Sequence, residues 1–268
     1  SACKNAHFSI CYSASSIVMR MKRNYRAVLQ YEGTRYQGWQ KQISTDNTIQ
    51  GKLEAILERM YGQYVEIHGS GRTDAGVHAF GQVANFHAPE NFSLEEIKAT
   101  LNEYLSKDIR VLKAEIVDER FHARLTAKAK TYEYRIDNGE VADVFQRKYV
   151  MREENPLDLE SMREAVGYLI GAHDFKSFCA NKKMKKSTVR TIYSINIEEN
   201  NGIVSIKYRG NGFLYNMVRI MVGTVLDIGL GRKSLDSIPK TLATQNRHLA
   251  GRTAPASGLY LCDVYYRS

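Results

Sequence analysis

Cysteine and histidine are scarce in this 268-residue sequence, which contains four cysteines and seven histidines. The cysteines show neither the spacing of a metal site nor the pattern of a disulfide framework; they are Cys3, Cys11, Cys179 and Cys262. The histidines are scattered and form no HExxH motif. We therefore expect chemistry without a metal or a cofactor, in a protein of the reducing cytoplasm.

Long apolar runs are also missing, and acidic residues are few for the number of basic ones. No run reaches the roughly 20 apolar residues that a membrane-spanning helix needs, so we expect no membrane partner. The chain has 38 Lys and Arg against 29 Asp and Glu, a formal net charge of +9. Such an excess is typical of proteins that bind a polyanion, usually nucleic acid. Charge alone does not distinguish such a protein from a soluble enzyme that is merely basic.

Residues 1–20, SACKNAHFSICYSASSIVMR, differ in character from the rest of the chain. They are too polar for the apolar segment of a secretory signal peptide. They precede Met21, where a regular strand pattern begins. We interpret residues 1–20 as an accessory extension, with Met19 or Met21 as the natural start.

The periodicity of residues 21–120 predicts one α+β unit. Strands are expected at 25–33, 63–68, 82–87 and 109–117, and helices over 48–62 and from Ser93 onward. Ser93 and Glu96 have the spacing of a capping box, which marks the start of the second helix. The resulting order, β-α-β-β-α-β, is that of the ferredoxin-like fold.

Residues 121–268 show a similar succession of strand and helix patterns. Strands are expected at 130–137, 188–199, 203–210 and 259–266, and helices over 157–171, over 213–229 and from about Ser234. The predicted fold class is therefore α+β, with two tandem ferredoxin-like units, 21–120 and 121–268, lying side by side. They would form a central antiparallel or mixed sheet with a catalytic cleft between them.

A glycine-rich stretch, GSGRTDAGVHAFGQ (69–82), links the two middle strands of the first unit and contains a single carboxylate, Asp74. Glycines there would let the backbone adopt positive φ angles and let a ligand approach closely. The stretch lacks the GxxxxGK[ST] pattern of a phosphate-binding loop. A plain hairpin loop, in which Asp74 is only a turn residue, would have a similar composition.

Arg219 is the one charged residue in the apolar run NMVRIMVGTVL (216–226). A guanidinium on such a helix is expected to be partly buried and to need a carboxylate, unless it extends to solvent from the helix end. In the two-unit fold, Arg219 and Asp74 can both face the central cleft. An ion pair would favour the charged form of Asp74, and an ionised, fixed carboxylate is a nucleophile.

Two basic runs suggest what approaches this carboxylate. Runs of this kind are often only solvated surface, but two of them in a chain of charge +9 fit a phosphate backbone. They are NKKMKKSTVR (181–190), with Lys182, Lys183, Lys185, Lys186 and Arg190, and RFHARLTAKAK (120–130), with Arg120, Arg124, Lys128 and Lys130. Tyr132 follows the second run directly. Its ring could stack on an unstacked base or belong to the core of an alternating strand.

With these residues in place, the chain resembles the tRNA pseudouridine synthase I family from about residue 23 to its end. GRTDAGVHA (71–79) is similar to the catalytic signature of that family. Four further segments agree in order and spacing: YEGTRYQGWQ (31–40), FHARLTAKAKTYEYRI (121–136), NMVRIMVGTVL (216–226) and APASGLYLCDVYY (254–266). Residues 1–20 have no counterpart.

The resemblance implies an isomerase that converts uridine to pseudouridine in tRNA without a cofactor. Asp74 would be the nucleophile and Arg219 its ion-pair partner, while Arg72 would flip or hold the nucleotide. Tyr132 would stack on the target uracil. Further substrate contacts are expected from Thr73, Gly76 and His78, and RNA contacts from Arg124, Lys128, Lys182, Lys183, Lys185 and Lys186.

The resemblance also implies a homodimer whose basic surface cradles tRNA. Each anticodon arm would enter a cleft, and the target uridines would lie at about positions 38 to 40 of the tRNA, where each must leave the stack to react. Two alternatives stay open: a pseudouridine synthase for another RNA, and an RNA-binding protein without catalysis.

Overall fold

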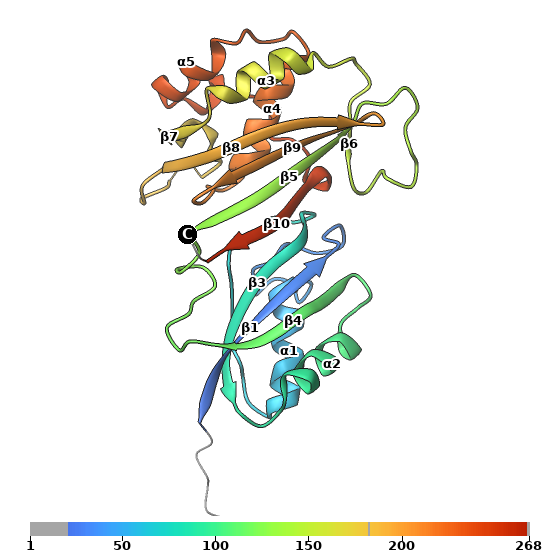
Figure 1. The fold of residues 1–268 in the computed structure, drawn as a ribbon, viewed down its shortest axis with the longest axis vertical. Helices are drawn as coiled ribbons and strands as arrows, with labels where there is room; N and C mark the ends of the chain where they lie inside the picture. The colour runs from blue at the N-terminus through green and yellow to red at the C-terminus, as the bar shows by residue number, and fades with distance from the viewer. Residues whose placement is uncertain (1–20, 182, 267–268) are drawn as a thin grey trace, which may run out of the picture.

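The computed structural model describes residues 21–181 and 183–266 (Figure 1). The extension predicted for residues 1–20, and Lys182 of the first basic run, lie outside these ranges.

The first half of the chain has the predicted order of elements. It consists of β1 (Lys22–Tyr31), α1 (Ile49–Tyr61), β2 (Ile67–Gly69), β3 (His78–Pro89), α2 (Leu94–Tyr104) and β4 (Ile109–Val117). Both helices begin at side-chain caps, because Thr48 accepts a hydrogen bond from the Gly51 amide and Ser93 forms the expected capping box with Glu96.

Strand β2 is shorter than predicted, and β3 begins earlier than predicted. Residues 63–66 lie outside β2, and the Tyr64 hydroxyl donates a hydrogen bond to Glu54 of α1. Strand β3 already starts at His78, so the glycine-rich stretch is part loop and part strand.

The second half contains the predicted strands and helices with two short additions. Its elements are β5 (Ala129–Asp137), β6 (Met151–Arg152), α3 (Leu159–Gly167), β7 (Gly171–Asp174), β8 (Val189–Asn200), β9 (Ile203–Gly210), α4 (Met217–Gly229), α5 (Ser237–Thr244) and β10 (Leu259–Tyr265), with 3-10 turns at Lys176–Phe178, Arg247–Leu249 and Ala256–Gly258. Strands β6 and β7 have two and four residues, too few to show a periodicity. The β8–β9 turn has positive φ at Asn201 and Gly202, as tight hairpins require.

Helix α4 starts four residues later than predicted. The reason is Asn216, whose φ of 58° is left-handed and cannot continue a right-handed helix. The residues before it therefore form a loop instead of a helical turn. Nearly all of α4 is buried, including Ile220, Met221 and Val225. Within the described ranges, no helix is long and apolar enough to cross a membrane.

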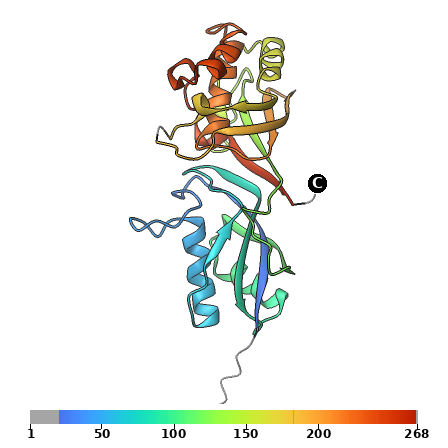
Figure 2. The ribbon, with the colours of Figure 1, turned by 90° about the vertical axis from the view of Figure 1, so that its left-hand side faces the viewer.

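All ten described strands belong to one mixed sheet, so the predicted α+β class is confirmed. The strand order is β4-β1-β3-β10-β5-β9-β8-β7, with β2 beside β3 and β6 beside β5. The two halves meet where β3 and β10 run parallel, with Tyr260 opposite His78 and Leu261 opposite Ala79. Figures 1 and 2 show α1 and α2 packed beside β1, β3 and β4, and α3, α4 and α5 packed beside the strands of the other half.

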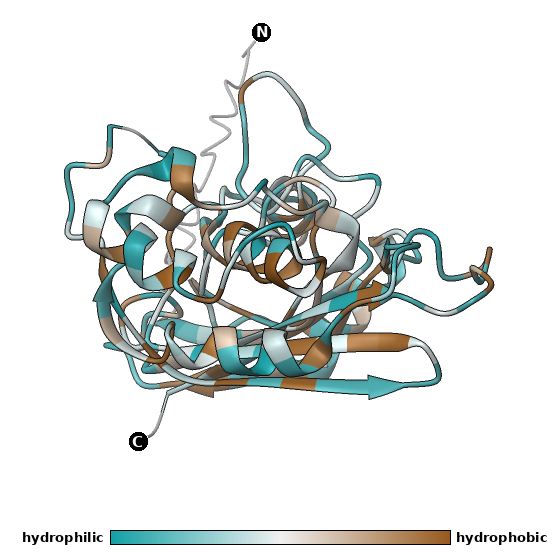
Figure 3. Cartoon of the chain, turned by 90° about the horizontal axis from the view of Figure 1, so that it is seen from above, coloured by the Kyte–Doolittle hydropathy of each residue, from teal (hydrophilic) through white to brown (hydrophobic). Residues whose placement is uncertain are grey.

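The core extends through both halves and is built from the inward faces of these elements. Leu53 and Phe86 are fully buried in the first half, and Tyr134 and Ile206 in the second. Figure 3 shows apolar residues concentrated on the helices and the strands beside them. The seam between β3 and β10 is thus flanked on both sides by packed structure that holds neighbouring loops in place.

Candidate active site

Asp74 lies in the loop between β2 and β3. The Val77 amide donates to the Asp74 carbonyl at 3.1 Å, which closes a tight turn, and Gly76 in that turn has a φ of 79°. Positive φ is accessible to glycine at little cost. Gly76 therefore shapes the turn that presents Asp74.

The segment 31–40, one of the motifs behind the family resemblance, packs against this loop and forms hydrogen bonds with it. The Trp39 amide donates to the Thr73 carbonyl at 3.0 Å, and the hydroxyls of Tyr31 and Thr73 are 2.7 Å apart. Gly38 has a φ of 87°, and a Cβ there would lie 2.6 Å from the Thr73 carbonyl oxygen. A side chain at residue 38 would therefore displace the loop beside Asp74.

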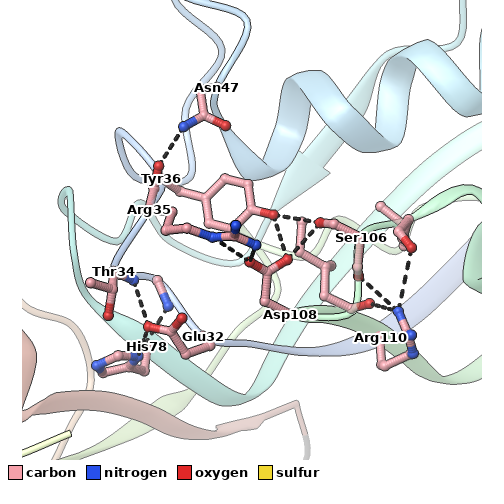
Figure 4. Close-up of polar contacts among 12 residues, drawn as sticks. Glu32, Thr34, Arg35, Tyr36, Asn47, His78, Ser106, Asp108 and Arg110 are labelled. Carbon is pink, nitrogen blue, oxygen red and sulfur yellow. Dashed lines mark hydrogen bonds and ion pairs between the residues drawn. The ribbon is translucent and has the colours of Figure 1, made fainter. Parts of the chain in front are cut away.

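A polar network fixes segment 31–40 in turn (Figure 4). Asp108, just before β4, accepts hydrogen bonds from the Tyr36 hydroxyl at 2.6 Å and from Arg35 Nη2 at 2.6 Å, and Ser106 also donates to it. Partial burial raises the pKa of Asp108, but these hydrogen bonds outweigh it and lower the pKa to about 2. The Tyr36 carbonyl accepts the Gly76 amide, so this network extends to the turn that carries Asp74.

Arg219 lies opposite Asp74, as the sequence predicts. Its Nη1 is 3.5 Å from Asp74 Oδ2, and the side chains are 17% and 23% exposed. The guanidinium also donates to Ala254 O at 2.7 Å and to Asn216 Oδ1 at 3.0 Å. Arg219 is thus held by three groups and does not extend from the helix end to solvent.

The sequence-based expectation for Asp74 considered the ion pair, which favours the charged form, and did not include the effect of burial. Burial raises the pKa of the Asp74 carboxyl above its usual value, and the charge and hydrogen bond of Arg219 offset only part of that rise. Desolvation has the larger effect, so the carboxylate is more basic than that of an exposed aspartate, and Arg219 favours its ionised form.

A cavity of about 510 Å³ opens beside this pair. Its lining comes from the Asp74 loop, from β5, from the loop 211–216 and from the start of α4. Basic side chains in its lining include Arg72, Arg124, Lys130 and Arg190. The volume is in the range of pockets that hold a small organic molecule, and its polar lining differs from an apolar ligand site.

Tyr132 belongs to the core, the second of the two alternatives that the sequence left open, and it also contributes to the cavity. It lies on β5, is 7% exposed, and packs edge-to-face on Phe213 with ring centroids 5.1 Å apart. It also lines the cavity. Burial, with nearby Tyr31 and Asp74, raises the pKa of Tyr132, so its phenol is neutral.

The positive φ expected in the stretch 69–82 is found at Gly76, whereas two other glycines of the stretch serve internal packing. A Cβ on Gly69 would lie 2.4 Å from the Trp39 ring, and one on Gly81 would lie 2.2 Å from the Cys262 carbonyl oxygen. Of the four glycines in the stretch, Gly71 alone is in the cavity lining.

Some of the predicted site residues line the cavity and others do not. Thr73 lines it, although its hydroxyl is engaged by Tyr31, and Arg72 lines it with its Nε bonded to Gln40 at 2.9 Å. His78 does not line it. The His78 side chain is 2% exposed, because its Nδ1 accepts the Gly33 amide and its ring stacks on Tyr260.

The predicted RNA-binding residues are also divided. Arg124 lines the cavity, whereas Lys128 is exposed and outside its lining. Lys185 and Lys186 line a second cavity of about 510 Å³, whose lining shares Asn181 and Met184 with the first. Lys183 is exposed and lines neither cavity, and Gly76 is likewise absent from both linings.

Sequence reasoning missed two residues of the site. Lys130 stands out in the sequence only as one of a basic run, yet it is partly buried and its Nζ donates to Ser70 O at 2.6 Å. Asn216 stands out only as part of a motif, yet it binds Arg219. For Lys130, the available signal was its two-residue spacing from Tyr132, which places both side chains on one face of a strand. For Asn216, it was the position of an asparagine directly before an apolar helix.

Metal ligands do not gather in the described ranges, where no three His, Cys, Asp or Glu side chains are placed to hold an ion. A carboxylate, an arginine partner, a buried aromatic ring and several cations around one cavity are typical of an enzyme that acts on nucleic acid.

Comparison with known proteins agrees with this class. The profile of the tRNA pseudouridine synthase family matches residues 27–125 and 165–267. The chain therefore belongs to the tRNA pseudouridine synthase family and is an isomerase.

Individual relatives match along most of their length. A protein of Bacillus sp. (strain KSM-64) named tRNA pseudouridine synthase A is 48% identical over 243 residues, covering 91% of this chain and 99% of that protein. The Brevibacillus brevis protein of the same name is 45% identical over 246 residues, covering 92% and 100%. A solved archaeal box H/ACA sRNP Nop10-Cbf5 complex aligns at 13% identity with a TM-score of 0.34, over 76% of this chain and 44% of that one, too distant to support an inference.

Proposed function

We propose that this enzyme isomerises uridine to pseudouridine in the anticodon stem-loop of tRNA, at about positions 38 to 40, with the uridine flipped out of the stack. The observation that carries the proposal is the Asp74–Arg219 pair, 3.5 Å apart beside a cavity lined by cations and the Tyr132 ring. The names of the relatives, which state that they are tRNA pseudouridine synthases, support tRNA as the substrate.

Asp74 is the nucleophile in this proposal. Its carboxylate attacks the flipped uridine at C1′ of the ribose or at C6 of the ring. The C1′–N1 bond breaks, the uracil rotates, a C1′–C5 bond forms, C5 loses its proton to solvent and N1 gains one. No atom is lost overall, and Asp74 is released unchanged. Arg219 keeps the carboxylate ionised against the desolvation that raises its pKa.

Tyr132, the buried residue of the two, stacks on the uracil. Arg72, which is exposed, holds the flipped nucleotide. Tyr132 is fixed by its contact with Phe213, so its face is oriented before the base arrives. Arg72 is exposed and bonded to an uncharged glutamine, Gln40, so its charge is free to meet a phosphate. Thr73 contributes through the backbone of the loop, since its hydroxyl is used by Tyr31.

The finer architecture is part of the same proposal. The strand orders β4-β1-β3-β2 and β10-β5-β9-β8 follow one pattern, which supports two tandem ferredoxin-like units, 21–120 and 121–268, with the cavity between them. We infer a homodimer in the cytoplasm whose basic surface cradles the tRNA.

Tritium release from tRNA labelled with [5-³H]uridine tests this function, because formation of the C1′–C5 bond expels the hydrogen of C5. We expect release from tRNA with a uridine at about positions 38 to 40 and none when these are cytidine. Release from other RNAs but not from tRNA would point to a different substrate. Binding of tRNA without any release would indicate an RNA-binding protein.

A further inference from the structure

Three cations lie near one another in the lining of the cavity. They are Lys130 on β5, Arg124 in the loop before it, and Arg190 on β8. Their charges are close enough for Arg124 and Arg190 to add to the effect of burial, which together lower the pKa of Lys130 to about 8. Burial also lowers the pKa of Arg190.

Within the described ranges none of the three forms an ion pair with an acidic side chain. Lys130 Nζ donates to the Ser70 carbonyl, and Arg190 Nη1 donates to the carbonyls of Ser187 and Val189. These neutral acceptors orient the side chains and leave their charge unbalanced. Lys130 and Arg190 are partly buried and Arg124 is exposed. Because a partly buried charge without a partner is costly, this cluster indicates an anion that arrives from outside the chain.

The loop that carries Asp74 leaves space for Lys130 at Gly71. A Cβ on Gly71 would lie 2.9 Å from Lys130 Nζ and 4.0 Å from the Tyr132 hydroxyl. The ammonium therefore occupies the space that a side chain at residue 71 would fill, beside the ring proposed to stack on the base. If the uracil stacks on the Tyr132 ring, the ribose-phosphate of the same nucleotide lies beside that ring.

We propose that Lys130, Arg124 and Arg190 form a clamp for one of the two phosphates flanking the target uridine, with Lys130 as the member beside the Asp74 loop. This inference rests on the proposed function. An ammonium suits this task as a compact point charge with three donors, and a charge-assisted hydrogen bond to a phosphate oxygen is among the strong ones. Lys130 is thus a substrate-binding residue and not only a brace for the loop.

Methylphosphonate substitution distinguishes these roles, because it removes the charge of a single phosphate and leaves the uridine intact. Stem-loop substrates with the substitution on either side of the target uridine are compared with the unmodified stem-loop, by tritium release, for the wild type and for Lys130→Met. The matched control is Lys98→Met, which removes an exposed lysine on α2, outside the cavity lining.

For one of the two positions we expect kcat/KM of the wild type and of Lys98→Met to fall about tenfold on substitution. For Lys130→Met, part of the loss is already present with unmodified RNA. The methylphosphonate should therefore reduce kcat/KM by clearly less than it does in the wild type, because one of the three cationic partners is gone. If the methylphosphonate lowers kcat/KM of Lys130→Met as much as it lowers that of the wild type, at both positions, the clamp is refuted and Lys130 only stabilises the loop. Absence of turnover by the wild type on unmodified RNA would instead refute the proposed function.

Discussion

Replacing Arg219 with methionine should shift the pH dependence of the enzyme, because Arg219 opposes the burial that raises the pKa of Asp74. Methionine has a similar length and no charge. It removes the guanidinium 3.5 Å from Asp74 Oδ2 as well as the hydrogen bonds to Asn216 and Ala254. The carboxyl then keeps its desolvation and loses the charge that offsets it.

The size of the shift follows from the distance and the burial of the pair. An arginine within about 4–6 Å lowers the pKa of an aspartate by about 1–3 units. The side chains here are 17% and 23% exposed, so solvent screens the pair only partly. We expect the acidic limb of kcat/KM to move to higher pH by about 1–3 units in Arg219→Met. The sign is fixed, because loss of a positive charge favours the protonated, inactive carboxyl.

The assay is tritium release from labelled tRNA across pH, with kcat/KM as the readout because it reports groups in the free enzyme. Arg219→Lys keeps the charge and loses the planar fork, so its limb should lie between those of the wild type and Arg219→Met, with a smaller loss of activity. Circular dichroism checks that each variant is folded. An acidic limb at the same pH in all three proteins would refute the assignment of Arg219 as the group that keeps Asp74 ionised.

Three further predictions concern binding. Replacing Lys183, Lys185 and Lys186 with alanine should weaken tRNA binding and reduce the salt dependence by about 0.7–0.9 log units for each phosphate that is no longer neutralised; an unchanged slope in a salt titration would place this loop away from the RNA. Tyr132→Phe should keep much of the stacking, worth about 1–3 kcal/mol per base, and Tyr132→Ala should lose it in filter binding, whereas wild-type affinity in the alanine variant would make the ring a core residue only. KM should rise as the pH passes about 8 in the wild type, because Lys130, facing Arg124 and Arg190, loses its proton there, and should stay flat in Lys130→Met; parallel profiles would contradict this.

Local signals in the sequence predicted most of the elements. The capping box of Ser93 and Glu96 and the alternation of β5 and β9 are properties of neighbouring residues, and the structure has these elements where they were expected. Strands β6 and β7 were missed because they are too short for a period. The start of α4 was misplaced because its apolar pattern continues through Asn216, where the backbone is left-handed.

The site was predictable only in part, because contacts between distant segments decide it. Asp74 and Arg219 could be paired from the two-unit order of elements, although 145 residues separate them. The burial of His78 depends on Gly33 and Tyr260, which approach from other segments of the chain, and no local pattern reveals it. The net direction of the Asp74 pKa depends on how much of the carboxyl is desolvated, which only the packed structure determines.

The most direct test of the central claim measures tritium release and tRNA affinity together for wild type, Asp74→Asn and Asp74→Glu. Asparagine keeps the shape and removes the nucleophilic anion, so turnover should fall at least about 10³-fold. Glutamate displaces the oxygen by about 1 Å, and such misplacement alone can cost about 10²-fold. Affinity should change about threefold or less in both, since phosphate contacts elsewhere dominate binding. Substantial turnover by Asp74→Asn would contradict the account, and joint loss of binding and turnover would make Asp74 a structural residue of its loop.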